Sequence, residues 1–172
     1  MNTNANINIE WKPLSASDGK DVYDMLQEIP RDENGFMNNI CGCTYEVFEQ
    51  WLVKSEKKAK GIGLKDWQVP QNIYWLYVDG RPVGMGKLRH FLTDALREEG
   101  GHGGYAVRPS ERGKGYGKLI LKYLLDEARK VGVERFLVTV HNQNTASIKV
   151  ALANGGVIER QNEVRHYIWI DC

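Results

Sequence analysis

Apolar residues recur along the chain with two periods, and the period changes several times. Residues 6–14 alternate apolar and polar positions, which predicts a first strand. The next apolar positions have helical spacing and predict an amphipathic helix that Pro30 ends: Val22, Met25, Leu26 and Ile29. After the loop "RDENGFMNNICGC", helical spacing returns in "TYEVFEQWLVKSEKKAK" and predicts a second helix.

From residue 72 the period of two dominates. "NIYWLYV" and "PVGMGKLRHF" flank Asp79-Gly80, a signal for a β-hairpin. A short helix in "TDALREE", a glycine-rich strand at 101–107, a long helix from about 115 to 131 and a strand in "ERFLVTV" are expected next. A helix in "NTASIKVALAN" and a closing hairpin from "GGVIER" and "VRHYIWI" complete the pattern. The order β-α-α-β-β-β-α-β-α-β-β predicts an α/β domain with a mixed sheet.

Composition narrows the possible functions. The 172 residues include 23 basic and 22 acidic ones, for a net charge of +1, which argues against a protein that coats nucleic acid. No apolar run approaches the length of a membrane span. The first eleven residues resemble no secretory leader, and three cysteines without a zinc-like cluster suggest reduced thiols and no metal, so a cytoplasmic protein is expected.

The stretch "RPSERGKGYGKLI" carries the strongest chemical signal. It connects a predicted strand to a predicted helix, and its glycines lie where the helix begins. The first amides of a helix lack partners inside the helix, and the helix dipole makes this end attractive to anions. Four basic residues add charge locally: Arg108, Arg112, Lys114 and Lys118. The pattern predicts a phosphate-binding loop.

Two common phosphate motifs do not fit this loop. A P-loop needs glycine five residues before the Gly-Lys pair and serine or threonine after it, but Arg112 and Leu119 occupy those positions. A dinucleotide fingerprint needs a third small residue where Ile120 stands. The segment "GHGGYA" matches the fingerprint formally, but "VRP" follows it instead of a helix.

A third motif does fit. Arg112-x-x-Gly115-x-Gly117, preceded by Val107-x-Pro109, resembles the acetyl-CoA signature of the GNAT superfamily of N-acetyltransferases, and "VTVHNQNTASIKVALANGG" resembles a second block of that superfamily. The resemblance extends over nearly the whole chain from residue 6. It implies one domain over residues 1–172, with substrate-side helices at about 17–60 and a CoA-binding core at about 100–155.

The resemblance also implies a fold and a donor site. The expected sheet is mostly antiparallel, flanked by helices, and splayed between the strands at about 101–108 and 134–140. Acetyl-CoA would lie in that gap as cosubstrate, with the backbone of Ala106 and Val107 and the side chain of Asn144 along its pantetheine arm. The amides of the loop would hold the pyrophosphate: Arg112, Gly113, Lys114, Gly115, Tyr116, Gly117 and Lys118.

The catalytic groups are less well specified. His102 lies where several superfamily members carry a glutamate, and an imidazole with a pKa of about 6.5 suits a general base; a structural histidine is the alternative. His141 is a weaker candidate, and Glu111 more simply stabilises the helix N-terminus. The tyrosine that many members use to protonate the leaving thiolate would stand at position 151, which is alanine here. Tyr105, Tyr167 or solvent would then supply that proton.

The acceptor side has only weak signals. Asp32 and Glu33 lie in the loop between the two N-terminal helices and could attract a cationic amine, although a solvated acidic loop is the simpler interpretation. The expected reaction is acetyl transfer to a primary amine on a small molecule. An acyl-CoA-binding sensor without turnover remains the alternative, and a homodimer through the C-terminal hairpin is possible.

Overall fold

The computed structural model describes residues 6–172. Its strands and helices follow the expected order, with two additions between the N-terminal helices. The elements of the first half are β1 (Ile9–Pro13), α1 (Lys20–Glu28), β2 (Asp32–Glu33), β3 (Phe36–Met37), α2 (Tyr45–Ala59), β4 (Gln71–Val78) and β5 (Arg81–Arg89). Those of the second half are α3 (Asp94–Glu98), β6 (Gly103–Val107), the 3₁₀ turn η1 (Pro109–Glu111), α4 (Tyr116–Lys130), β7 (Arg135–His141), α5 (Thr145–Ala153), β8 (Val157–Gln161) and β9 (Arg165–Asp171). Residues 1–5, part of the stretch considered for a leader and of the predicted domain, lie outside the described residues.

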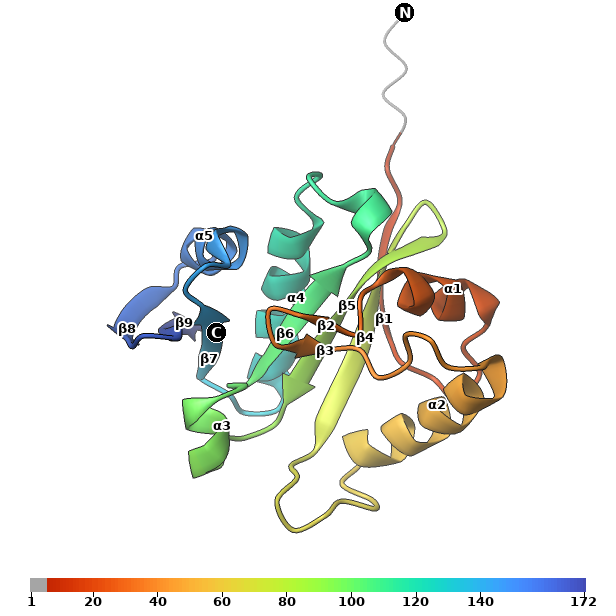
Figure 1. The fold of residues 1–172 in the computed structure, drawn as a ribbon, viewed down its shortest axis with the longest axis horizontal. Helices are drawn as coiled ribbons and strands as arrows, with labels where there is room; N and C mark the ends of the chain where they lie inside the picture. The colour runs from red at the N-terminus through yellow and green to blue at the C-terminus, as the bar shows by residue number, and fades with distance from the viewer. Residues whose placement is uncertain (1–5) are drawn as a thin grey trace, which may run out of the picture.

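The main strands form two antiparallel sheets. One has the order β1-β4-β5-β6 and the other the order β7-β9-β8. Figure 1 shows α1 and α2 on one side of the first sheet, with the second sheet and α5 at the opposite end of the molecule. The expected α/β fold with a mostly antiparallel, helix-flanked sheet is confirmed.

The sheets meet at one end and then diverge, as the predicted splay requires. The amide of His102 donates to the carbonyl of Leu137 across the junction at 2.9 Å. Beyond this contact, β6 and β7 share no ladder of hydrogen bonds in the described chain, and each belongs to a different sheet. One edge of β6 therefore keeps backbone groups that no strand pairs.

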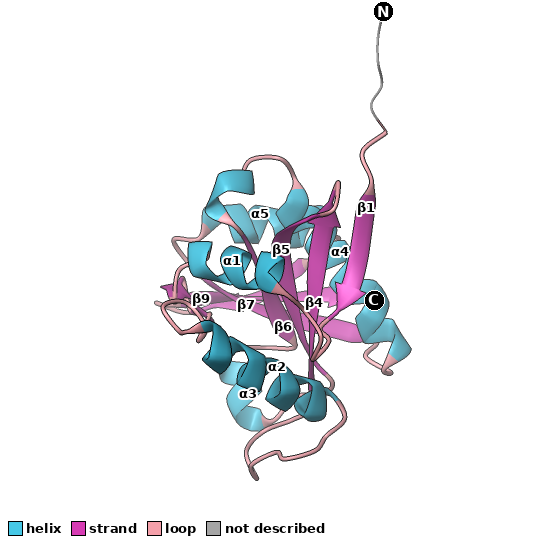
Figure 2. Cartoon of the chain, turned by 90° about the vertical axis from the view of Figure 1, so that its right-hand side faces the viewer, coloured by secondary structure: helices cyan, strands magenta, loops and turns pink. Residues whose placement is uncertain are grey.

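Two apolar layers hold the helices on the sheet. Figure 2 shows α1 and α2 in front of the strands and α4 behind them. Helix α4 buries a continuous stripe against the sheet: Ile120, Leu121, Leu124, Leu125 and Ala128. Glycines on β5 allow this close approach, because a Cβ on Gly84 would lie 2.6 Å from Ile120 and one on Gly86 2.9 Å from Leu124.

The loop between α1 and α2 contains a small hairpin that the apolar pattern did not predict. Strands β2 and β3 pair around Asn34 and Gly35, whose φ angles are 52° and 84°. Two consecutive positive φ angles give the tight turn that Asn-Gly favours. The hairpin places the loop beside the gap between β6 and β7.

Candidate active site

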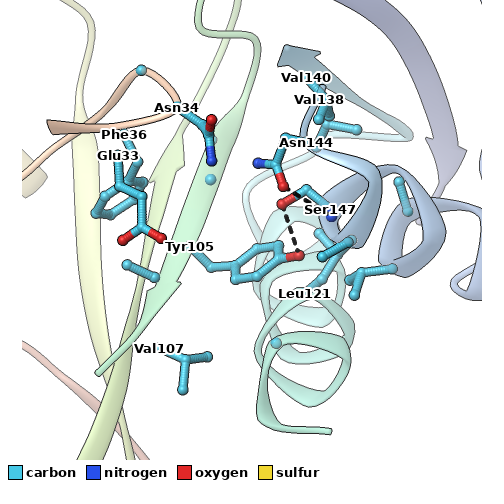
Figure 3. Close-up of a pocket in the computed structure, with 18 of the residues that line it drawn as sticks. Glu33, Asn34, Phe36, Tyr105, Val107, Leu121, Val138, Val140, Asn144 and Ser147 are labelled. Carbon is cyan, nitrogen blue, oxygen red and sulfur yellow. Dashed lines mark hydrogen bonds between the residues drawn. The ribbon is translucent and has the colours of Figure 1, made fainter. Parts of the chain in front are cut away.

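A cleft of about 540 Å³ opens where β6 and β7 diverge. Its walls come from β6, the glycine-rich loop and the start of α4 on one side, and from β7 and α5 on the other. The β2–β3 hairpin and the end of β5 form its third boundary. Figure 3 shows side chains from these segments facing a common space. The predicted donor residues, except Lys114, thus line one cleft together with the loop between the N-terminal helices, whereas Lys114 pairs with Glu111 at 2.7 Å.

The glycine-rich loop presents backbone amides to the cleft. Gly113 and Gly115 have φ angles of 78° and 84°, a region that other residues rarely adopt, and open space lies where their Cβ atoms would be. Helix α4 begins directly after Gly115, without a side-chain cap and without an acidic residue in its first turn. Its first amides therefore keep free donors and an unopposed helix dipole, which suits an anion.

The outer edge of β6 lies next to this loop. Ala106 and Val107 pair with β5 through one edge only, opposite Met85 and Gly84. The carbonyl of Val107 accepts a hydrogen bond of 3.0 Å from Nε of Arg112. Ala106 and Val107 both line the cleft, so an extended ligand could run beside β6 as an added strand would.

Arg112 also makes an ion pair across the cleft boundary. Its Nη2 lies 2.6 Å from a carboxylate oxygen of Glu33, which belongs to the β2–β3 hairpin. Asp32, the other acidic candidate, accepts the amide of Gly35 at 3.0 Å and stabilises the turn. Glu33 lines the cleft, whereas Asp32 does not belong to its lining.

Asn144 lies on the opposite wall and caps α5. Its side-chain oxygen accepts the amide of Ser147 at 3.3 Å, and its side chain also lines the cleft. The cap leaves the side-chain nitrogen Nδ2 of Asn144 without a protein partner among the described residues, whereas its backbone amide donates to the carbonyl of His141. The two roles considered for this residue are geometrically compatible.

Tyr105 reaches across the cleft from β6. Its hydroxyl donates to Oγ of Ser147 on α5 at 3.3 Å (Figure 3). Burial raises the pKa of the Tyr105 hydroxyl above its ordinary value, so the group stays protonated at neutral pH. Ala151, where a tyrosine was expected from the family pattern, is buried at the same wall. A phenol from β6 thus stands close to the helix that lacks one.

Tyr167 occupies a different environment. Its hydroxyl donates to the carbonyl of Glu98 at 2.9 Å and accepts a bond from Asn162 at 3.3 Å. The guanidinium of Arg160 covers its ring at 3.5 Å. The side chain is almost fully buried and does not belong to the cleft lining. Of the two tyrosines considered as acids, the structure brings only Tyr105 to the cleft.

The two histidines considered as bases also differ in place. His102 is buried, and its Nδ1 accepts the amide of Leu137 at 2.8 Å. Burial, together with Arg97 and Arg89, lowers its pKa to about 4. His102 thus joins the two sheets and lies outside the cleft lining, whereas His141 belongs to that lining. A Cβ on Gly35 would lie 3.1 Å from Nε2 of His141, so this imidazole lies directly beneath the hairpin.

Sequence analysis missed three basic residues of the cleft: Arg165, which pairs with Glu99, and Lys87 and Arg89, which form no ion pair within residues 6–172. Lys87 and Arg89, near the end of β5, line it on the side of the β2–β3 hairpin. The strand pattern places both on one face, two residues apart, and this signal was available in the sequence. The distance between that face and the glycine-rich loop depends on the tertiary fold. No group of His, Cys, Asp and Glu side chains in residues 6–172 could hold a metal ion.

A family model described as "Acetyltransferase (GNAT) family" matches residues 21–155. A curated protein of Salmonella typhimurium, named L-methionine sulfoximine/L-methionine sulfone acetyltransferase, is 33% identical over 92 residues. That match covers 52% of this chain and 52% of the curated protein, so the similarity extends over about half of each.

Solved structures agree on the fold. The GNAT domain of S. lividans PAT superposes with a TM-score of 0.67 at 14% identity and covers 95% of this chain and 90% of its own. The N-acetyltransferase PseH of Campylobacter jejuni, in complex with acetyl coenzyme A, gives a TM-score of 0.58 at 14% identity, with 95% and 99% covered. At these identities the likeness concerns the fold alone. In residues 6–172 no helix combines the length and the apolarity needed to cross a bilayer.

Proposed function

The chain belongs to the acetyltransferase (GNAT) family, and from this premise we propose that it transfers the acetyl group of acetyl-CoA to a primary amine on a small molecule. The observation that carries the proposal is the cleft at the divergence of β6 and β7, with free helix amides at one end. Those amides suit the pyrophosphate of the donor, and the unpaired edge of β6 suits its pantetheine arm.

The name of the curated relative supports a small-molecule acceptor. L-Methionine sulfoximine and L-methionine sulfone, which that name gives as substrates, are α-amino acids, and each carries one primary amine. Because the match covers only half of each protein, the name supports the class of acceptor and not its identity. In the proposed reaction the amine nitrogen attacks the thioester carbonyl carbon, the C–N bond forms, the C–S bond breaks, and the thiolate takes a proton.

Tyr105 is the proposed proton donor to the thiolate. Its hydroxyl lies in the cleft, bonded to Ser147, and its raised pKa keeps it protonated at neutral pH. A positioned acid of this kind contributes about 100-fold to a rate. Tyr167 donates to a carbonyl outside the cleft lining and is the matched control for Tyr105.

His141 is the proposed base, acting directly or through a water molecule. An alkyl ammonium must lose a proton before its nitrogen can attack, and an imidazole is suited to accept one near neutral pH. His141 lines the cleft beneath the hairpin, whereas His102 uses Nδ1 for the amide of Leu137. We assign His102 to the structural alternative considered for it.

The test is release of free thiol from acetyl-CoA in the presence of a panel of primary amines. We expect at least one small amine to give turnover, and we expect Tyr105→Phe to lower kcat by about 100-fold while Tyr167→Phe leaves it unchanged. Tight binding of acetyl-CoA with no thiol release for any amine would contradict the enzyme and favour the acyl-CoA sensor. Equal losses in both tyrosine variants would contradict the role of Tyr105.

A further inference from the structure

Lys87 and Arg89 form a pair of cations at the end of the cleft beside the β2–β3 hairpin. We call this the acceptor end, because the glycine-rich loop proposed for the donor lies at the other end. They point to the same face of β5, two residues apart, and Met85 on that face packs in the core with α1 and α2. Both line the cleft beside the β2–β3 hairpin. This face of β5 is thus apolar at Met85, inside the core, and carries two positive charges at Lys87 and Arg89, inside the cleft.

Neither cation has an anionic partner in the described chain. Nζ of Lys87 donates to the carbonyl of Met37 and lies 4.5 Å from the centre of the Phe36 ring. Nη1 of Arg89 donates to the carbonyls of Gly100 and Gly101 at 3.0 and 3.2 Å. Among residues 6–172, no carboxylate lies within ion-pairing distance of either side chain.

The other arginines of the cleft show what a paired cation looks like here. Arg112 lies 2.6 Å from Glu33, and Arg165 lies 3.5 Å from Glu99. These pairs neutralise their own charge within the free protein. Among the described residues, Lys87 and Arg89 instead keep their positive charges with neutral contacts alone: backbone carbonyls and, for Lys87, the Phe36 ring.

Holding these charges away from water is unfavourable. Burial, and secondarily the neighbouring Arg89, lowers the pKa of Lys87 to about 8, and burial lowers the pKa of Arg89 as well. At neutral pH most molecules still carry a proton on both side chains. Three donors on an ammonium and five on a guanidinium exceed the bonds that these two groups make, so donors remain for a ligand.

We propose that the acetyl acceptor carries a carboxylate and that Lys87 and Arg89 bind it at this end of the cleft. The inference rests on the proposed acetyl transfer and specifies the class of acceptor. An anion here would supply the missing counter-charge through charge-assisted hydrogen bonds, with the fork of Arg89 suited to a carboxylate.

The register of the sheet places the backbone of Lys87 next to β6. Lys87 lies opposite Gly104 of β6, so one strand spacing of about 4.8 Å separates the ammonium-bearing residue from the strand next to the proposed thioester. The residues of β6 nearest to Lys87 are Gly103 and Gly104, which have no side chains that could separate Lys87 from this strand. An α-amino acid, the class to which the substrates named for the curated relative belong, would carry such a carboxylate next to its amine.

The test measures how fast the intact protein acetylates three forms of each acceptor: the L-amino acid, its α-carboxamide and its decarboxylated amine. We expect kcat/KM for the free amino acids to exceed that of the other two forms by at least about tenfold. The amine of a carboxamide is less basic and more of it is neutral, so weaker turnover of that form cannot come from protonation of the amine.

Variants then separate binding of the carboxylate from a structural role. Lys87→Met and Arg89→Met should each lower kcat/KM for amino acids by about 10- to 100-fold and leave that of the carboxamides unchanged. Lys12→Met is the control outside the cleft lining: Nζ of Lys12 lies 4.3 Å from the Tyr77 ring, as that of Lys87 lies near Phe36, but it is paired with Glu10 at 3.1 Å. It should leave all three forms unaffected.

These experiments distinguish failure of the carboxylate site from failure of acetyl transfer itself. If no amine of any form releases thiol, the proposed function fails and this inference fails with it. If carboxamides or decarboxylated amines are acetylated as well as the amino acids, acetyl transfer stands and the carboxylate site is wrong. Equal losses for all three forms in Lys87→Met and Arg89→Met would give these residues a structural role and also overturn the proposal.

Discussion

In the proposed function, the two ends of the cleft would bind their ligands through different parts of the chain. At the donor end, the free groups are backbone amides at the start of α4 and the unpaired edge of β6. At the proposed acceptor end, the groups that line the cleft are side chains from separate segments: Glu33, Lys87, Arg89 and His141. A backbone site needs glycines at fixed spacing, whereas a side-chain site needs only that distant segments fold together. The first leaves a sequence motif and the second does not.

The largest effect should come from the donor end. Gly115 and Gly132 lie at the two ends of α4 with φ angles of 84° and 85°, and neither has an atom within 4 Å of where its Cβ would be. Gly115→Glu and Gly132→Glu therefore cost similar backbone strain, about 1 kcal/mol. Only Gly115→Glu puts a carboxylate where the pyrophosphate is proposed to bind, and we expect about 100-fold weaker CoA binding by calorimetry.

The same measurement checks the proposed donor end. Gly132→Glu should bind CoA as the unsubstituted protein does, because the C-terminus of α4 lies away from the cleft lining. If both variants lost affinity equally, general destabilisation would explain the effect. If Gly115→Glu bound CoA normally, the pyrophosphate would not lie at this helix.

A smaller effect should distinguish the two histidines. His141→Gln should lower kcat/KM by about tenfold, because water replaces a positioned base only in part, and should leave the unfolding midpoint unchanged. His102→Gln should instead lower the free energy of unfolding, since its ring accepts a buried amide and packs against Phe136. Urea titrations and initial rates on both variants provide the check. A loss of activity in His102→Gln alone, with stability intact, would reverse the assignment.

His102 also makes a prediction about pH. Its folded pKa of about 4 lies below the ordinary value of 6.5, so the unfolded chain binds a proton that the folded one does not. The free energy of unfolding is therefore fully retained above about pH 6.5 and should fall by about 3 kcal/mol as the pH drops to about 4. In His102→Gln this part of the pH dependence should disappear from urea unfolding curves.

The smallest effect concerns the contact between the two ends. Arg112 is paired with Glu33 in the free protein, and both side chains are more than one-third exposed. A donor that uses Arg112 must compete with this pair, so Glu33→Gln should tighten CoA binding by about two- to threefold, in line with the small strength of exposed ion pairs. The gain should vanish at high salt, where the pair is screened. Weaker binding in Glu33→Gln would mean that the pair orders the loop for the donor.

Much of the fold could be predicted because its signals are local. The period of two in residues 72–91 and the apolar stripe of α4 follow from alternation and helical spacing, and the structure has these elements at nearly the expected bounds. The β2–β3 hairpin was missed although Asn34-Gly35 is a turn signal, because its strands have only two residues each and no apolar alternation. The predicted domain boundaries remain predictions.

The catalytic candidates show where sequence reasoning ends. The position of His102 in the chain, beside β6, was predictable, but the direction of its ring depends on Leu137 in another sheet. Tyr105 and Tyr167 are equally plausible acids in the sequence, and only the tertiary fold separates them, because it brings the hydroxyl of Tyr105 to Ser147 of α5 across the cleft. Lys87 and Arg89 lie on a predictable face, but their lack of acidic partners depends on residues far away in the chain.

The order of the site residues along the chain has an evolutionary consequence. Glu33, Lys87 and Arg89 precede residue 100, whereas the glycine-rich loop and Asn144 follow it. Under the proposed roles, mutations that accumulate in the first hundred residues would exchange one acceptor for another without altering the part of the gene that encodes donor recognition. His141 is the exception, because it comes from the second half and lies under a hairpin of the first. New acceptor preferences that arise in this way would inherit the same proposed base.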